Sequence, residues 1–356
     1  MNFQLMPDTS PNVLLVEDSL VEMAIIKKIL EDNGIHVVGT AMNGVEALKK
    51  IPLLNPDVIC TDYHMPEMDG MELTKQVMEK YPRPILVLSI SAQPYQVHNI
   101  MNILKAGALD VMAKPLPHSG GVVCTDAKLL VEKIRILAGV KIISNHKKKA
   151  TQAENSVRAM SNDALKVPQI IGIGSSTGGP QALLKILSEL PEDFSIPIVC
   201  VQHISAGFLP GFVEWLNDNA RLSVVAAEAG MTPHGGYVYV APESQHLILD
   251  SDKRFKLLPA DVGDIYLPSV DCLFTSLANV YHDACVGVVL SGMGCDGSQG
   301  VVAIHAHGGL TMAQDEESSV IFGMPKSAIE TGAVTTVLPL HSISERLIKL
   351  QGQTVE

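Results

Sequence analysis

The chain has 356 residues, of which 47% are hydrophobic, so it is long enough for two domains with buried cores. This composition excludes an intrinsically disordered chain, a collagen-like repeat and a small disulfide scaffold. The net charge of −12 at pH 7 argues against sequence-independent binding to nucleic acid, because phosphate backbones repel an acidic chain.

Residues 12–137 alternate short apolar runs with segments in which apolar residues repeat at i, i+3, i+4 and i+7. This alternation is typical of a parallel sheet covered by helices. Five such units in about 125 residues predict a doubly wound domain of the flavodoxin type. Its expected strands are residues 13–16, 36–41, 58–61, 85–89 and 110–113.

Charged residues follow three of these strands. Glu17 and Asp18 lie where the first strand ends, and Asp62 lies where the third ends. In a doubly wound sheet these carboxyl ends are neighbours and form a ligand crevice. Three converging carboxylates repel one another unless a cation lies among them, and their hard oxygen atoms suit Mg²⁺. Lys114, just after the fifth strand, adds a positive charge at the same edge.

This acidic cluster indicates phosphoryl transfer. An ionised aspartate beside Mg²⁺ can attack a phosphoryl donor, and the metal and the lysine neutralise the charge of the resulting aspartyl phosphate. A hydroxyl at the end of the fourth strand, Ser89 or Ser91, is placed to bond to the new phosphoryl group and to pass on the change as a local rearrangement.

The same residues resemble the receiver domains of bacterial two-component response regulators, over residues 12–137. The resemblance implies that Asp62 accepts phosphate from a histidine kinase, with Mg²⁺ held by Glu17, Asp18 and Asp62. It implies a switch hydroxyl at Ser89, with Ser91 still open, and a phosphoryl-binding Lys114. The motifs that carry it are Glu17-Asp18, Asp62 within Asp-Tyr-His-Met-Pro-Glu-Met-Asp-Gly, Ser89 and Lys114-Pro115.

Beyond residue 137 the apolar periodicity stops. Residues 141–168 hold six basic and two acidic residues, which predicts a solvated linker, or else a segment that docks on an acidic surface. We therefore expect one domain at 1–139, a linker at 140–166 and a second domain at 167–356. A new alternation predicts that the second domain is also a doubly wound α/β fold. Its expected strands are residues 170–173, 198–201, 224–227, 236–240 and 286–290.

A glycine-rich run, Gly172-Ile-Gly-Ser-Ser-Thr-Gly-Gly-Pro180, follows the first strand of the second domain. Gly178 comes one residue too late after Gly172 and Gly174 for a dinucleotide site, and the run lacks the lysine of a P-loop. The run instead contains Gly-x-Ser-x-Gly, the tight strand-to-helix turn that exposes a serine hydroxyl. Ser176 is then the nucleophile, and the Thr177 N–H at the helix start is placed to stabilise an oxyanion.

A serine hydroxyl needs a base, and the second domain offers seven histidines. His203 ends the strand after the Ser176 helix, so it is expected at the same sheet edge. His305 and His307 lie in a segment of helical pattern and are expected to be packing residues. Asp296, in the glycine-rich loop after strand 286–290, is the carboxylate expected to orient His203.

Residues 168–350 resemble the catalytic domain of the chemotaxis protein-glutamate methylesterases, the CheB family. The resemblance implies a Ser176 nucleophile, a His203 base, an orienting Asp296 and a Met293 N–H near the oxyanion. Family members often have alanine where Ser175 stands, so which of two adjacent hydroxyls attacks stays open. The motifs are Gly-Ser-Ser-Thr-Gly-Gly-Pro, Gln202-His203 followed by Gly207-Phe208, and Gly292-Met-Gly-Cys-Asp-Gly297.

The resemblance further implies hydrolysis of glutamate γ-methyl esters on methyl-accepting chemoreceptors, with no cofactor for that step, and deamidation of receptor glutamines. The receiver implies activation through phosphorylation by a chemotaxis histidine kinase. One alternative is a non-catalytic output domain whose serine loop cradles an anion and binds a ligand or partner. Another is a DNA-binding output domain, which the acidic character of residues 169–356 disfavours.

The six cysteines form no Cys-x-x-Cys pair, and no signal-like segment opens the sequence. The longest apolar runs have the length of a strand, well short of the ~18 residues of a membrane span. These features predict a cytoplasmic protein with reduced thiols and without membrane insertion.

Overall fold

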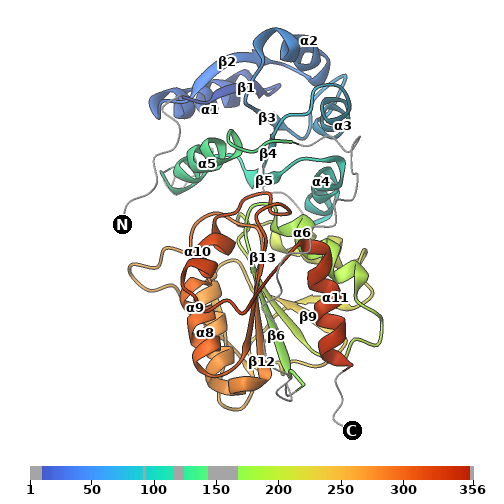
Figure 1. The fold of residues 1–356 in the computed structure, drawn as a ribbon. Coiled ribbons are helices and arrows are strands. Elements are labelled where there is room, and N and C mark those ends of the chain that lie inside the picture. Colours follow the sequence, from blue (N-terminus) through green and yellow to red (C-terminus); the bar gives the residue numbers. More distant parts are fainter. Residues whose placement is uncertain (1–9, 91–93, 116–123, 143–166, 353–356) are drawn as a thin grey trace. The chain divides into compact units, whose positions relative to one another are not determined.

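The computed structural model describes residues 10–90, 94–115, 124–142 and 167–352 in two units (Figure 1). The linker expected at 140–166 lies almost entirely outside the described residues. No helix among the described residues is long and apolar enough to cross a membrane.

The first unit is a five-stranded parallel sheet with the strand order β2-β1-β3-β4-β5. All five predicted strands are confirmed, and so is the doubly wound fold. In Figure 1 helices α1 and α5 cover one face of the sheet, and α2, α3 and α4 cover the other. The strands are β1 (Asn12–Val16), β2 (His36–Ala41), β3 (Val58–Asp62), β4 (Ile85–Ser89) and β5 (Asp110–Ala113), and the helices are α1 (Leu20–Asp32), α2 (Gly44–Leu54), α3 (Gly70–Lys80), α4 (Pro94–Ala106) and α5 (Cys124–Leu137).

The first three helices of this unit begin by the same local device. A short polar side chain in extended backbone accepts a hydrogen bond from the backbone N–H three residues later, and a glutamate in the first turn favours the helix dipole. Each cap therefore fixes the residue at which its helix begins, beyond the carboxyl end of the preceding strand. The pairs are Ser19 with Glu22, Asn43 with Glu46, and Asp69 with Glu72.

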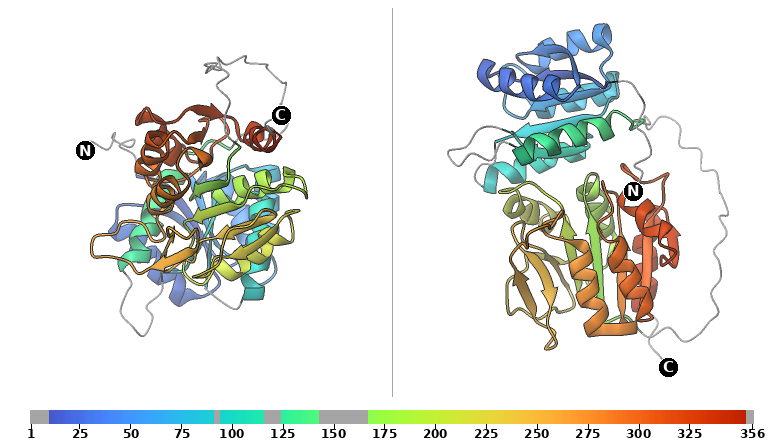
Figure 2. Two further views of the ribbon diagram at one scale, coloured as in Figure 1. Left: turned by 90° about the horizontal axis from the view of Figure 1, so that it is seen from below. Right: turned by 90° about the vertical axis from the view of Figure 1, so that its left-hand side faces the viewer.

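The second unit is a seven-stranded parallel sheet with the order β14-β13-β12-β6-β7-β9-β8. Helices α8 and α9 cover one face, and α6 and α11 cover the other (Figures 1 and 2). The strands are β6 (Ile170–Ser175), β7 (Ile198–Gln202), β8 (Ser223–Ala226), β9 (Tyr237–Val240), β12 (Cys285–Val289), β13 (Leu310–Gln314) and β14 (Thr336–Leu338), and the helices are α6 (Gly179–Glu189), α7 (Leu209–Asn217), α8 (Val270–Tyr281), α9 (Ser298–Ala306), α10 (Met324–Glu330) and α11 (Leu340–Gln351).

The five strands predicted for the second unit are confirmed, with ends that differ by one or two residues. Four further strands were not predicted: β13, β14 and the antiparallel hairpin of β10 (His246–Leu249) and β11 (Phe255–Leu258). None of these four strands contains more than three consecutive apolar residues. Apolar runs this short do not predict a strand by themselves, and the strands are ordered by pairing with their neighbours.

Two glycines bring α8 close to the middle of the seven-stranded sheet. Gly172 in β6 pairs in register with Gly287 in β12, and both lie under Phe274 of α8. A Cβ at Gly172 would lie 2.9 Å from Phe274 Cε1, and one at Gly287 would lie 2.6 Å from Ile304 Cδ1. Because neither position has a side chain, α8 can pack closer to the sheet than any larger residue would allow.

We predict that Gly287→Val destabilises the protein by about 1–3 kcal/mol, because the valine overfills a packed interior and displaces Phe274 or Ile304. Urea denaturation followed by circular dichroism measures the change. Gly352→Ala is the matched control, since its Cβ meets no atom closer than 3.9 Å. Equal stability of the two variants would show that α8 can move away from the sheet at little cost in free energy.

Candidate active site and acidic cluster

Ser176 lies in a tight turn between a buried strand and a helix. It directly follows β6, and α6 begins three residues later, after Gly178 in the left-handed conformation at φ 77°. The Ser176 N–H donates to the carbonyl of Ser291 at 3.0 Å, which attaches the turn to the loop after β12. This is the strand-to-helix geometry that the Gly-x-Ser-x-Gly motif predicts, and it leaves the Ser176 residue 7% exposed.

The two adjacent serines have different surroundings. Ser175 is fully buried, and its hydroxyl donates to Gln202 Oε1 at 2.6 Å. The Gln202 amide in turn donates to the carbonyls of Ser176 and His203, each at 2.9 Å. The Ser175 hydroxyl is thus engaged in joining β6 to β7, whereas Ser176 lies beyond the strand. Sequence reasoning did not assign this joining role to Gln202.

His203 lies beside Ser176 because of the strand register. Ser175 pairs with Gln202 in the parallel ladder, and the His203 N–H donates to the Ser175 carbonyl at 3.0 Å. Ser176 and His203 are therefore the next residues on neighbouring strands, at the same edge of the sheet. Among the described residues no hydrogen bond joins the Ser176 hydroxyl to the His203 ring. Such bonds often form only once substrate is bound.

Asp296 is buried and accepts four hydrogen bonds. His203 Nε2 lies 2.8 Å from Asp296 Oδ2, which also accepts from the Val270 N–H at 2.7 Å. Asp296 Oδ1 accepts from the Ser269 hydroxyl at 2.9 Å and from the Asp271 N–H at 3.0 Å. Three of the four donors belong to the N-terminus of α8, where backbone N–H groups and the helix dipole stabilise an anion.

These donors decide the charge of Asp296. Burial alone raises the pKa of this carboxyl, but the hydrogen bond and charge of His203 and the N–H groups of Val270 and Asp271 outweigh burial and leave the pKa below its ordinary value. Asp296 is therefore an anion at neutral pH that orients the His203 ring. The predicted pairing of His203 with Asp296 is present in the structure.

Tyr266 packs against the other side of His203. The two rings stack with centroids 5.3 Å apart and an interplanar angle of 2°. The Tyr266 hydroxyl accepts from the Cys295 N–H at 3.2 Å, and burial raises the pKa of the phenol to about 12, so the hydroxyl stays neutral. Sequence reasoning missed Tyr266, because nothing in its sequence neighbourhood indicates that it contacts a histidine 63 positions earlier.

The two backbone groups predicted to stabilise an oxyanion lie on either side of Ser176. Thr177 follows it at the start of the turn and is 2% exposed. Met293 follows Gly292, and a Cβ at Gly292 would lie 2.9 Å from Ser176 Cβ. The Gly292 carbonyl accepts from the N–H groups of Gly323 and Met324, which attaches this loop to the start of α10.

The acidic cluster of the first unit gathers as predicted. Glu17, Asp18 and Asp62 each offer an oxygen atom, and these atoms lie within 4.8 Å of one another. Lys114 Nζ lies 2.8 Å from both Glu17 Oε2 and Asp62 Oδ2. It also lies 2.6 Å from Oε2 of Glu22, a fourth carboxylate that sequence reasoning did not include.

The charges of this cluster are not balanced by protein groups. Burial raises the pKa of both Glu17 and Asp62, and the hydrogen bonds from Lys114 only partly offset it. Burial lowers the pKa of Lys114, but its hydrogen bonds to Asp62, Glu17 and Glu22 outweigh burial and raise the pKa above its ordinary value. One lysine thus faces several carboxylates, and their oxygen set fits a hard divalent cation such as Mg²⁺.

Ser89 ends β4, one residue beyond the partner of Asp62 in the ladder, and is 3% exposed. Its carbonyl accepts from the Lys114 N–H at 2.9 Å. Ser91 lies outside the described residues. The expectation that His305 and His307 are packing residues is wrong, since both are exposed at the end of α9.

The two units and their polar clusters define a class of protein: a response regulator whose receiver is joined to an α/β hydrolase. The family model described as "Response regulator receiver domain" matches residues 13–120, and that described as "CheB methylesterase" matches residues 171–347. The structure is similar to the crystal structure of the Thermotoga maritima CheB methylesterase catalytic domain, with 40% identity and a TM-score of 0.50, covering 51% of this chain and 98% of that one.

Two relatives are similar to this chain over nearly its full length. The chain is 38% identical over 349 residues to a protein-glutamate methylesterase/protein-glutamine glutaminase of Nitrosospira multiformis, covering 97% of this chain and 98% of the relative. It is 38% identical over 347 residues to one from Hahella chejuensis, covering 96% and 99%. The chain belongs to the CheB methylesterase family, and it is an enzyme.

We predict that Asp62→Asn raises the free energy of unfolding at pH 7 in buffer without divalent cations. A raised pKa means that the ionised carboxylate costs stability above that pKa, and the amide removes the charge. Mg²⁺ should stabilise the wild type, by about 2.7 kcal/mol at a hundredfold excess over its Kd, and the variant less. Thermal unfolding with and without Mg²⁺ measures both effects. Identical Mg²⁺ responses would contradict the assignment of this cluster as a cation site.

Proposed function

We propose that this chain demethylates glutamate γ-methyl esters of methyl-accepting chemoreceptors, and deamidates receptor glutamines, under the control of phosphorylation at Asp62. The observation that carries the proposal is the His203–Asp296 pair at 2.8 Å, at the sheet edge where Ser176 begins the turn into α6. The names of the relatives supply the substrate chemistry. The domains are a receiver at 1–139, a linker at 140–166 and a hydrolase at 167–356.

In the proposed reaction the Ser176 hydroxyl attacks the γ-carbonyl carbon of the ester. His203 takes the hydroxyl proton on Nδ1, since Nε2 faces Asp296. The carbonyl oxygen becomes an oxyanion, which the N–H groups of Thr177 and Met293 stabilise. His203 then protonates the departing methoxide, so that methanol and an acyl-enzyme remain. Water, deprotonated by the same histidine, releases the glutamate and restores Ser176.

Ser176 rather than Ser175 is the proposed nucleophile. The Ser175 hydroxyl is fully buried and donates to Gln202 Oε1, so an attack by it would first break a buried hydrogen bond. Ser176 lies outside the strand, beside the N-terminus of α6, whose dipole favours a negative charge.

The receiver is proposed to regulate this site. The carboxylate of Asp62 attacks the phosphorus of a phosphohistidine on the kinase, and the histidine leaves. Glu17, Asp18 and Asp62 would hold Mg²⁺, and the ion would supply positive charge to neutralise the phosphoryl group. Lys114 already contacts Asp62 and is placed to pair with a phosphoryl oxygen, and the Ser89 hydroxyl is placed to bond to it.

We predict that Ser176→Ala abolishes methanol release from methylated receptor membranes, because the nucleophile is removed. Ser175→Ala, the matched control, should keep at least about a tenth of the wild-type rate, since it loses one hydrogen bond beside the site. Asp62→Asn should keep the basal rate and lose the stimulation by a small phosphodonor with Mg²⁺. Turnover by Ser176→Ala would refute the nucleophile, and no release by the wild type under any condition would favour a binding module.

We predict that Asp296→Asn lowers kcat by roughly 10⁴-fold, as the equivalent change does in a serine protease, because the amide stabilises the wrong histidine tautomer. The KM for receptor should change little, since the side chain is buried and lies behind His203. Steady-state methanol release at several receptor concentrations separates the two constants. An Asp271→Asn variant is the control on the same helix end, and comparable losses in both would point to a structural effect.

A further inference from the structure

The carboxylate that orients His203 depends on the first residue pair of α8. Ser269 caps this helix: its hydroxyl accepts from the Cys272 N–H at 3.4 Å and donates to Asp296 Oδ1 at 2.9 Å. The next residue, Val270, donates its N–H to Asp296 Oδ2. The position of Asp296 is therefore set by the backbone conformation of Ser269, which is extended at φ −106° and ψ 133°.

A second histidine holds that backbone. His246, the first residue of β10, is 5% exposed, and its Nδ1 lies 3.1 Å from the backbone nitrogen of Ser269. A backbone N–H only donates, so Nδ1 must be the unprotonated acceptor. The ring proton then sits on Nε2, which lies 2.9 Å from Asp264 Oδ2 and donates to it. Asp264 Oδ2 also accepts from the Asp261 N–H at 2.6 Å, which orients the carboxylate.

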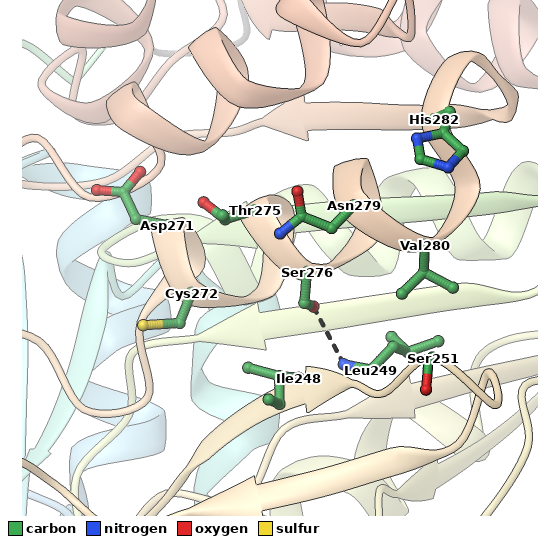
Figure 3. Close-up of a pocket in the computed structure, with 10 residues that line it drawn as sticks. All are labelled: Ile248, Leu249, Ser251, Asp271, Cys272, Thr275, Ser276, Asn279, Val280 and His282. Atoms are coloured by element: carbon green, nitrogen blue, oxygen red, sulfur yellow. Dashed lines mark hydrogen bonds between the residues drawn. The ribbon is translucent and has the colours of Figure 1, made fainter.

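The strand that carries His246 is fastened to α8 at a second point. The Leu249 N–H donates to the Ser276 hydroxyl at 3.1 Å, about two helical turns after Ser269 (Figure 3). Figure 3 shows residues of β10 and α8 facing each other across this bond. Residues of both elements line a groove of about 760 Å³. The hairpin thus contacts the helix both at its beginning and near its middle, so His246 is held at a fixed height beside Ser269.

We propose that His246 is a positioning residue for the reaction, acting through Ser269 on the Asp296–His203 pair. The chain of hydrogen bonds runs from Asp264 through His246, Ser269 and Asp296 to His203. This inference rests on the proposed function. None of the first three residues touches the reacting atoms: they hold the N-terminus of α8 where its donors keep Asp296 ionised and aligned with His203.

The test compares His246→Leu with His246→Asn in the full chain, using methanol release from methylated receptor membranes with Mg²⁺ and a small phosphodonor. His246→Leu keeps the volume and removes the acceptor for the Ser269 N–H. We expect kcat to fall roughly ten- to hundredfold, as a displacement of about 1 Å in a catalytic group does, while KM stays within about twofold. In His246→Asn the amide oxygen takes the place of Nδ1, and most of kcat should return. His305→Ala, at an exposed histidine of the same unit, should match the wild type.

A second pair of readouts separates positioning from general destabilisation. His246→Gln places its amide oxygen nearer to the position of Nε2 than of Nδ1, so its kcat should resemble that of the leucine variant even where the two amide variants melt at the same temperature. The low-field proton resonance of the His203–Asp296 hydrogen bond should persist in His246→Asn and shift or broaden in His246→Gln. If His246→Leu does not fold, this amide pair still decides the question.

Ser176→Ala is measured in parallel. If it is inactive while His246→Leu has the wild-type kcat, only the role of His246 is overturned. Equal kcat in His246→Asn and His246→Gln, or a loss confined to KM, overturns it as well. If Ser176→Ala still turns over, the proposed function fails first, and with it this inference.

Discussion

The hydrolase unit depends on one buried anion at a helix N-terminus. A carboxylate that is 1% exposed costs free energy unless its charge is matched by donors, and Asp296 receives four. Three of these come from the first residues of α8, so the helix has to begin beside the loop that carries Asp296. The glycine pair under Phe274 permits this placement by letting α8 lie close to the sheet. The packing of α8 on the sheet therefore also determines where Asp296 meets His203.

The edges of the two sheets place an aspartate in opposite electrostatic surroundings. Four hydrogen-bond donors surround the Asp296 carboxylate, and its pKa lies below the ordinary value. Asp296 is therefore ionised at neutral pH. Asp62 shares one lysine with Glu17 and Glu22, and burial raises its pKa. A bound cation stabilises the ionised form of an aspartate in such a cluster, and so does a reaction that spreads its charge over more oxygen atoms. The surroundings, rather than the residue type, lower the pKa of Asp296 and raise that of Asp62, as the roles proposed for the two side chains require.

Residues around the serine turn position Ser176, His203 and the start of α8. Ser175 and Gln202 connect β6 to β7 and so place Ser176 and His203 on adjacent strand ends. Tyr266 fixes the plane of the His203 ring by stacking, and the hairpin of β10 and β11 holds the start of α8. These contacts position the backbone and side chains that surround the Ser176 hydroxyl.

The sequence by itself determined the two α/β units, the carboxylates at the ends of β1 and β3, and the serine turn after β6. These features are local: apolar runs, glycines at tight turns and acids after strands carry their meaning within a few residues. Parallel topology then places strand ends together, which is why Asp62 meets Glu17 and why His203 meets the serine turn. The spacing of the motifs alone did not decide between Ser175 and Ser176.

Only the tertiary structure identified the other contacts around the two sites and the short strands. Tyr266, Glu22 and His246 reach their partners across long sequence separations, and no periodicity marks them. The strands β10, β11, β13 and β14 were missed because none of them has more than three consecutive apolar residues, so that pairing and burial order them. The prediction that His305 and His307 pack in the core was wrong, because a helical pattern does not say which face of the helix meets the core. Side-chain partners are set by packing in three dimensions, and the sequence records only the elements that bring them there.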